Sequence, residues 1–130
     1  VAYLRQPFDD SGLRTIPIGH EPRVACMPAT HPLARREKLT CADLDGEKMI
    51  TATTRPMSSI EEKFELIAAG HGIALISISA ARSYSRPGLV HLPVTDAPGA
   101  ETCLAVAADR RENQLLRDFV EIATATLRRA

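Results

Sequence analysis

The chain has 130 residues, with 16 Lys and Arg against 16 Asp and Glu, 45% hydrophobic content and 4% aromatic content. This length supports a hydrophobic core without disulfides or metal ions as staples. The zero net charge and the scarcity of aromatic rings argue against a surface that neutralises phosphates or stacks bases, so we expect no direct nucleic-acid binding by this chain.

The cysteines, the apolar runs and the N-terminal residues indicate the class of protein and its cellular compartment. Cys26, Cys41 and Cys103 make an odd, widely spread set that suits no disulfide framework, so we expect a reduced, cytoplasmic protein. The apolar runs at residues 73–81 and 102–108 are shorter than the roughly 18 apolar residues of a membrane helix. The sequence opens without Met or a signal pattern, in the middle of an expected strand, which predicts a piece of a longer protein.

The first third of the sequence predicts mainly extended structure. Residues 1–5 and 13–19 have the composition of strands, with turn-forming residues between them. Residues 24–27 form a short apolar run that suits a buried strand. Thr40, followed three residues later by Asp43, predicts the N-cap of a helix of one or two turns.

The middle of the sequence predicts a brief strand at residues 48–51 and then a helix over about residues 59–69. Ser58 and Ser59, followed by two glutamates, give a capping box in either of two registers, and Gly70 should end the helix. The expected apolar stripe is Ile60, Phe64, Ile67 and Ala68, and the expected solvent-facing residues are Glu61, Glu62, Lys63 and Glu65.

The last part of the sequence alternates strands and helices. Residues 72–77 form an uninterrupted apolar strand, which is typical of parallel sheets covered on both faces and indicates an α/β fold. A short helix at residues 79–83 and strands at 89–94 and 102–108 should follow, before a terminal helix that opens at residue 112 or 113. The expected core side of this helix is Leu116, Phe119, Val120, Ala123 and Leu127.

Patterns for catalysis, metal binding or cofactor binding are weak. The sequence has no Gly-x-Ser-x-Gly or Ser-x-x-Lys motif, so we expect no enzyme, with a Cys/His pair assembled by folding as the remaining catalytic alternative. His20, Cys26 and His31 match no zinc spacing, and we expect no metal ion or cofactor. Residues 70–72, Gly-His-Gly, follow a helix and precede a strand, which is the reverse of a phosphate-binding loop.

Residues 51–59 are the most informative segment. They offer five hydroxyls and one guanidinium between the carboxyl end of an expected strand and the amino end of a helix. Ligands gather at that place in open α/β sheets, and a helix N-terminus favours anions. Two interpretations stay open: the segment faces a ligand, or Ser58 or Ser59 only caps the helix while the threonines fill a polar turn.

Several motifs follow one another in a recognisable order. They are residues 13–18, EPRVACMP at 21–28, HPLA at 31–34, LTCADL at 39–44 and EEKFELIAAGHGIAL at 61–75. This ordered set resembles the effector-binding domain of LysR-type transcriptional regulators, and the resemblance covers nearly the whole chain.

The resemblance implies an α/β fold of two lobes, like type 2 periplasmic solute-binding proteins, with a small effector in the cleft between the lobes. About residues 18–77 would form the second lobe, and about residues 1–17 and 78–130 would form part of the first. The family's effector contacts map by motif onto Arg5, Gln6, Thr51, Thr53, Ser58 and Ser59.

The chain departs from the family pattern in three places. Its domain is expected to be incomplete at the N-terminus, without the helix-turn-helix and the first part of lobe one. The second lobe is expected to be shortened, because a helix and a strand that the family usually has between Thr51 and Ser58 are missing, which bears directly on the roles assigned to Thr51 and Thr53. Ser77 stands where the family often has Pro, and is a candidate cap for the next turn.

The expected function is that of a non-catalytic, ligand-sensing domain of a bacterial LysR-type regulator. It would bind a small anionic, carboxylate-type effector, work as a homo-oligomer and depend on a separate N-terminal domain for DNA binding. Strand edges and apolar surface left by the missing elements predict dimers or larger species. The alternative is a solute-binding protein or a small α/β enzyme of the same architecture, because fold alone does not fix function.

Overall fold

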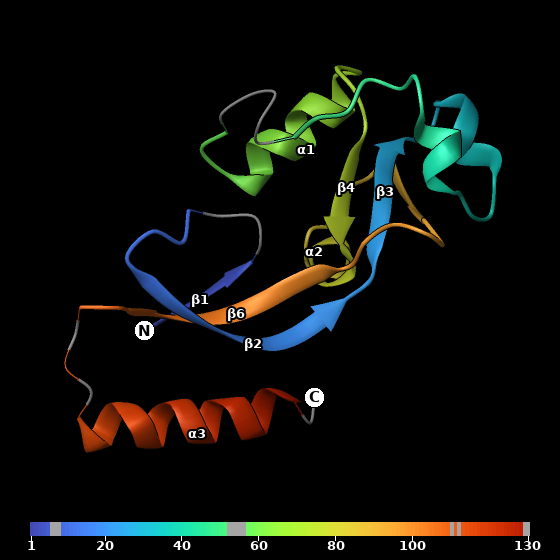
Figure 1. The fold of residues 1–130 in the computed structure, drawn as a ribbon. Helices are drawn as coiled ribbons and strands as arrows, with labels where there is room; N and C mark the ends of the chain where they lie inside the picture. Colours follow the sequence, from blue (N-terminus) through green and yellow to red (C-terminus); the bar gives the residue numbers. More distant parts are fainter. Residues whose placement is uncertain (6–8, 52–56, 110, 112, 129–130) are drawn as a thin grey trace. The chain divides into compact units, whose positions relative to one another are not determined.

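The computed structural model describes residues 1–5, 9–51, 57–109, 111 and 113–128. The chain forms two compact units (Figure 1): unit 1 comprises Val1–Glu21 and Ala100–Ala130, and unit 2 comprises Pro22–Gly99. The sequence analysis predicted that the chain re-enters the first lobe after about residue 77. In the structure, residues 78–99 belong to unit 2. They do so because the strand formed by residues 89–93 pairs with a strand of unit 2.

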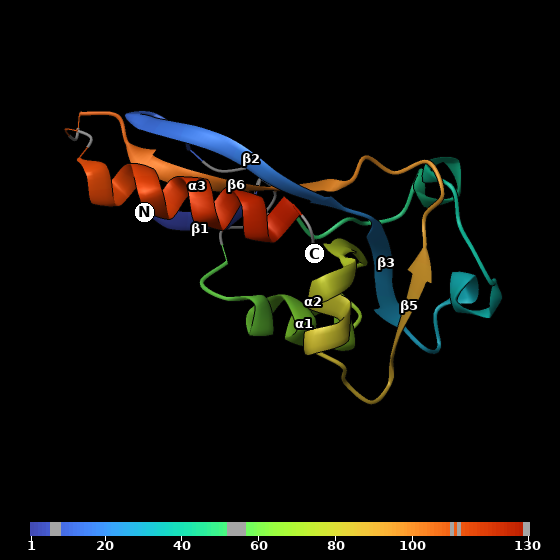
Figure 2. The same ribbon diagram turned by 90° about the horizontal axis from the view of Figure 1, so that it is seen from below.

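Unit 1 is a three-stranded antiparallel sheet with one helix packed on it. The sheet has the order β1-β6-β2, with β1 at Ala2–Arg5, β6 at Ala100–Ala107 and β2 at Leu13–Glu21. Ile16 and Ile18, two residues apart on β2, pack toward α3 (Gln114–Arg128), which lies along the sheet (Figure 2). The strands predicted at both ends of the sequence are therefore confirmed.

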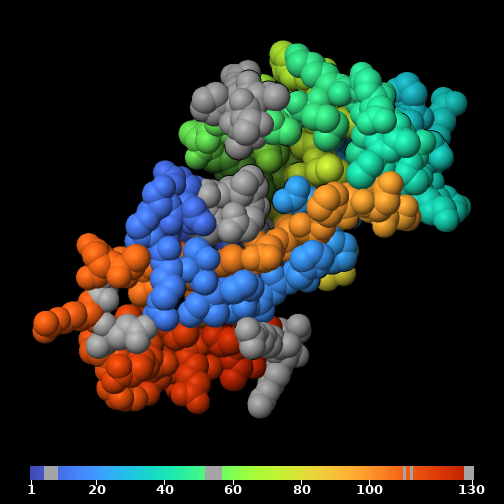
Figure 3. Space-filling view, viewed as in Figure 1, coloured from blue at the N-terminus to red at the C-terminus, as the bar shows by residue number. Residues whose placement is uncertain are grey.

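Helix α3, red in Figure 3, has one apolar side that packs on the sheet and a second that is exposed. The packed side includes Val120, Ala123 and Leu127. The prediction that Phe119 belongs to this side is wrong, because its side chain is 44% exposed. The adjoining, exposed apolar residues of the helix are Leu115, Phe119 and Ile122.

Unit 2 is built on a second antiparallel sheet, of order β4-β3-β5. Its strands are β4 (Ala74–Ser77), β3 (Arg23–Pro28) and β5 (Leu89–Pro93). The expectation of a parallel sheet is wrong, because β4 and β5 both run antiparallel to β3. Both faces of the sheet are nevertheless covered, so the apolar run of β4 correctly indicated burial but not strand direction.

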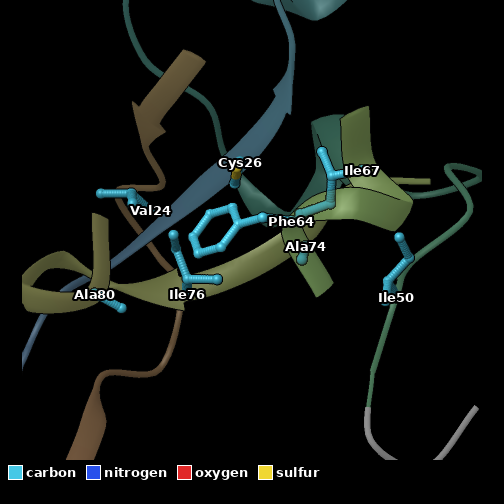
Figure 4. Close-up of a cluster of buried hydrophobic side chains, with 8 residues drawn as sticks. All are labelled: Val24, Cys26, Ile50, Phe64, Ile67, Ala74, Ile76 and Ala80. Atoms are coloured by element: carbon cyan, nitrogen blue, oxygen red, sulfur yellow. The ribbon is translucent and has the colours of Figure 1, made fainter. Parts of the chain in front are cut away.

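One face of this sheet carries α1 (Ile60–Ala68) and α2 (Ile78–Ser83). Phe64 and Ile67 of α1 are buried against Val24 and Cys26 of β3 (Figure 4). These two α1 residues confirm the core of the predicted apolar stripe, whereas Ala68 at its end is exposed.

The other face of the sheet carries two short 3₁₀ helices, η1 (Pro32–Arg35) and η2 (Cys41–Leu44). Ala25 and Met27 of β3 point to this side, as the alternation of side chains along a strand requires. The predicted cap of η2 is present: the Asp43 carboxylate accepts hydrogen bonds from the backbone N–H (2.8 Å) and the hydroxyl (3.0 Å) of Thr40.

Candidate functional site

The six residues predicted to contact an effector fall in different parts of the chain. Gln6 and Thr53 lie outside the described residues. The other four are Arg5, at the end of β1 in unit 1, and Thr51, Ser58 and Ser59 in unit 2.

The hydroxyl of Ser59 caps α1, and the hydroxyl of Ser58 is bonded to a side chain of the same helix. Ser59 Oγ accepts the N–H of Glu62 at 3.2 Å, and the Glu62 carboxylate accepts the N–H (2.9 Å) and the hydroxyl (3.0 Å) of Ser58. The prediction that one of the two serines caps the helix is confirmed for Ser59, while ligand contact by either serine stays a prediction. Because the chain's own carboxylate already lies at this helix N-terminus, a bound anion there has to compete with Glu62.

Thr51 follows a segment that was predicted as a strand, but the structure has only an isolated bridge there, between Met49 and Ile73. Ile73 N–H donates to Lys48 O at 2.9 Å, and Ile50 N–H donates to Ile73 O at 2.8 Å. These two hydrogen bonds fix the backbone up to Ile50, whose side chain is buried in the core beneath α1. Thr51 itself is half-buried at the end of this fixed segment.

Two cationic side chains in unit 2 escaped the sequence analysis. Lys63 on α1 was expected to face water, but it is half-buried, and burial together with the positive charge of Arg23 lowers its pKa. Arg23, the first residue of β3, is also half-buried. Among the described residues, neither side chain forms an ion pair. One sequence feature could have indicated the partial burial of Lys63: it lies between Ile60 and Ile67, at helical spacing from both.

Two open hollows lie on the described surface, and none of the six predicted residues is among the residues that line them. The first, of about 190 Å³ in unit 2, is lined by Glu61, Phe64, Glu65, Tyr84, Ser85 and Arg86. The Phe64 and Tyr84 rings stack there with centroids 6.0 Å apart, and Arg86 forms an ion pair with Glu65. The second, of about 260 Å³ in unit 1, is lined by Arg14, Leu116, Arg117, Val120 and Glu121.

All three cysteines are free thiols. Cys26 is fully buried, and this burial raises its pKa to about 11. Burial and the nearby carboxylate of Asp96 raise the pKa of Cys41, which is partly exposed. Cys103 is buried in β6, where its thiol donates to Glu101 Oε1 at 3.3 Å. Because the thiolate is the reactive form, the environments of Cys26 and Cys41 hold these thiols in the unreactive, protonated state.

Over the part of the chain that the structure describes, no group of three or more His, Cys, Asp or Glu side chains could hold a metal ion. Within the same residues, no helix is long and apolar enough to cross a membrane.

Comparisons with known proteins identify the family to which the chain belongs. The family model of the LysR substrate binding domain matches residues 1–57 and 53–128, which together span nearly the whole chain. The two matches meet in the segment where the sequence analysis places the missing helix and strand. None of the curated proteins compared with the chain matches it.

Several solved structures have the same fold. The reduced form of OxyR is 25% identical, with a TM-score of 0.75 over 97% of this chain and 68% of that chain. A mutant OxyR regulatory domain from Pseudomonas aeruginosa is 20% identical, with a TM-score of 0.73 over 97% of this chain and 69% of that chain. The CcmR regulatory domain from Synechocystis PCC6803, in complex with 2-PG, is 20% identical, with a TM-score of 0.70 over 96% and 72%.

The chain spans 48% of a full-length mutant OxyR from Pseudomonas aeruginosa. These similarities confirm the predicted type 2 periplasmic-binding-protein-like α/β fold. The chain belongs to the family of LysR substrate-binding domains, the effector-binding domains of bacterial LysR-type transcriptional regulators.

Proposed function

We propose that this chain is the ligand-sensing, non-catalytic part of a LysR-type regulator and that it binds a small anionic effector of carboxylate type between its two lobes. The observation that carries this proposal is the family match over nearly the whole chain. The similar solved structures include the regulatory domains of OxyR and CcmR, which favours this function over a solute-binding protein or an enzyme of the same architecture.

The proposed mechanism is a shift between two arrangements of the lobes. An effector changes the equilibrium only by the difference between its affinities for the two arrangements. That difference would then reposition a separate helix-turn-helix domain that contacts DNA, because binding at one site and binding at the other are thermodynamically linked. We place this activity in the cytoplasm, where regulator and DNA meet.

The anionic character of the effector rests on two observations. The structurally similar CcmR regulatory domain was solved with 2-PG bound. In this chain, Arg23 and Lys63 place two half-buried positive charges in unit 2. The serines at the start of α1 support the proposal less than their position in the sequence indicated, because Glu62 already occupies their hydrogen-bonding groups.

Redox sensing is the rival to effector binding, because OxyR is known in a reduced and an oxidized form. The thiols of this chain do not favour it. A thiol that senses oxidants needs a lowered pKa and access to solvent. Here Cys26 is buried with a raised pKa, Cys41 has acidic neighbours that raise its pKa, and Cys103 is buried.

The proposed homo-oligomer is supported by the exposed side of α3. Leu115 and Ile122 are 78% and 66% exposed, and they lie with Phe119 on one side of the helix. A contiguous apolar patch of this kind favours association, and a second copy of the chain would cover it. Light scattering at micromolar concentration should show dimers or larger species that the exchange Ile122→Glu dissociates. A well-folded, strictly monomeric wild-type chain would contradict this.

The effector proposal is tested by calorimetric titration of the full-length regulator with a panel of organic acids, each compared with its neutral amide. We expect at least one acid to bind and its amide to bind much more weakly. Binding of neutral hydrophobic compounds alone would overturn the proposal.

A further inference from the structure

The hollow of about 190 Å³ in unit 2 is lined by helix α1 and by the segment that follows α2. Tyr84 forms its aromatic wall: the residue is 40% exposed, and its ring stacks on the ring of the buried Phe64. The backbone of Tyr84 is held as well, because its N–H donates to Ala80 O at 2.9 Å at the end of α2. The hollow therefore has a supported aromatic ring that is partly accessible to solvent.

The charged groups around this ring carry one negative charge in excess. Glu65 forms an ion pair with Arg86, so these two charges neutralise each other. Glu61 lies four residues before Glu65, on the same side of α1, and is exposed. Among the described residues, no group forms an ion pair or a hydrogen bond with the Glu61 carboxylate. Because like charges at this helical spacing repel each other, a second cation beside Glu61 would be favourable.

The size and the chemistry of the lining restrict the ligand. The volume is below the roughly 300–1,000 Å³ of pockets for drug-sized molecules, so the hollow suits a small group. The face of an aromatic ring attracts cations, and the Glu61 carboxylate attracts them as well, whereas it repels anions. The hydroxyl of Ser85, which also lines the hollow, can accept an N–H from a ligand. All three groups favour a cation that carries some apolar surface.

We propose that this hollow binds a small organic cation, of the alkylammonium or guanidinium class, between the Tyr84 ring and the Glu61 carboxylate. The site is separate from the proposed effector site, because none of the six residues predicted to contact the effector lines it. The dissociation constant should lie roughly in the millimolar range, since an exposed cation–π contact and an exposed ion pair each contribute little free energy.

Tyrosine NMR tests the proposal with a simple probe. The chain has two tyrosines, and Tyr3, which is 54% exposed and lies in unit 1, is an internal control for Tyr84. At constant ionic strength, tetramethylammonium chloride should shift the ring signals of Tyr84 in a saturable manner and leave those of Tyr3 unchanged. Tert-butanol, a neutral molecule of similar size, should cause no saturable shift. Equal changes at both tyrosines, or equal binding of tert-butanol, would overturn the proposal.

A second pair of probes identifies the source of the cation. Guanidinium chloride represents a free cation, and N-acetylarginine amide represents an arginine side chain of another protein. Tighter binding of the arginine derivative supports the proposal with a side chain as the occupant, and tighter binding of the bare ion supports it with a free cation.

Substitutions test the two named groups. Glu61→Gln should weaken binding of tetramethylammonium roughly two- to fivefold, the loss expected for one exposed ion pair. Tyr84→Leu should weaken it at least as much, whereas Tyr84→Phe, which keeps the ring, should not. Glu37→Gln, at an exposed glutamate outside the hollow, is the matched control and should leave the affinity unchanged. The amide signals of α1 report binding in every variant, and unchanged affinity in both Glu61→Gln and Tyr84→Leu would overturn the proposal while leaving the proposed effector function standing.

Discussion

Gly72 offers the sharpest test of how the segment before Thr51 is held. Its φ is +155°, and a Cβ at this position would overlap the carbonyl oxygen of Lys48 and lie 3.1 Å from Ile50 Cγ1. The same carbonyl accepts the N–H of Ile73. In the variant Gly72→Ala, therefore, the methyl group either strains the backbone or pushes the Lys48 carbonyl away from its hydrogen bond.

The expected cost of Gly72→Ala is about 2–6 kcal/mol when both hydrogen bonds of the bridge are lost. Backbone strain at such a position contributes roughly 1–3 kcal/mol, and each lost hydrogen bond of the bridge contributes about 0.5–1.5 kcal/mol. Gly70→Ala is the matched control, because Gly70 has φ +80° but no atom within 4 Å of the added Cβ. Its cost should be only about 1–2 kcal/mol, the intrinsic penalty of the left-handed conformation.

Urea unfolding followed by far-ultraviolet circular dichroism measures both variants. With a slope of roughly 1–3 kcal/mol per molar urea, Gly72→Ala should lower the midpoint by about a molar or more, and clearly further than Gly70→Ala does. If the two variants lose equal stability, the close approach of Gly72 to Lys48 does not hold the segment in place.

Three further predictions follow from the titratable groups and the charge balance. Burial lowers the pKa of His91, whose Nε2 has no hydrogen-bond partner in the described structure, so the folded state favours the neutral ring. Stability should therefore be lost as the pH falls below 6.5, the ordinary pKa of histidine. The variant His91→Leu should reduce the change in urea midpoint between pH 7.5 and pH 5. An equal change in the variant and the wild type would refute this. In the native protein, Cys41 should react with iodoacetamide before Cys26, because the Cys26 thiol is buried and has a pKa of about 11. Mass spectrometry of timed samples measures the order of reaction, and the opposite order would contradict the prediction. Residues 1–130 alone should show no saturable, sequence-dependent DNA binding by anisotropy at physiological salt, because the charges of 16 positive and 16 negative side chains cancel. Such binding would contradict the proposal that a separate domain binds DNA.

Local features of the fold could be predicted from the sequence because a few neighbouring residues determine them. The caps of α1 and α2 follow from Ser59 and Ser77, whose hydroxyls accept the N–H groups three residues ahead. Gly70 ends α1 in the left-handed conformation that glycine adopts most easily.

Features that depend on distant partners could not be predicted in the same way. The apolar composition of β4 indicates burial on two faces but is compatible with either strand direction, and only its pairing with β3 settles that direction. Phe119 keeps helical spacing with the core side of α3, yet the sheet of unit 1 covers only part of that helix. Lys63 is charged and lies among glutamates in the sequence, so its partial burial is visible only in the folded unit.

The proposed interlobe effector site is tested most directly by ¹H–¹⁵N NMR of residues 1–130, titrated with the acid that calorimetry identifies. The account predicts that one ligand perturbs amides in both units, near Arg5 in unit 1 and near Thr51 in unit 2, with a single dissociation constant. Perturbations confined to one unit, or equal perturbations by the neutral amide of the same acid, would contradict it.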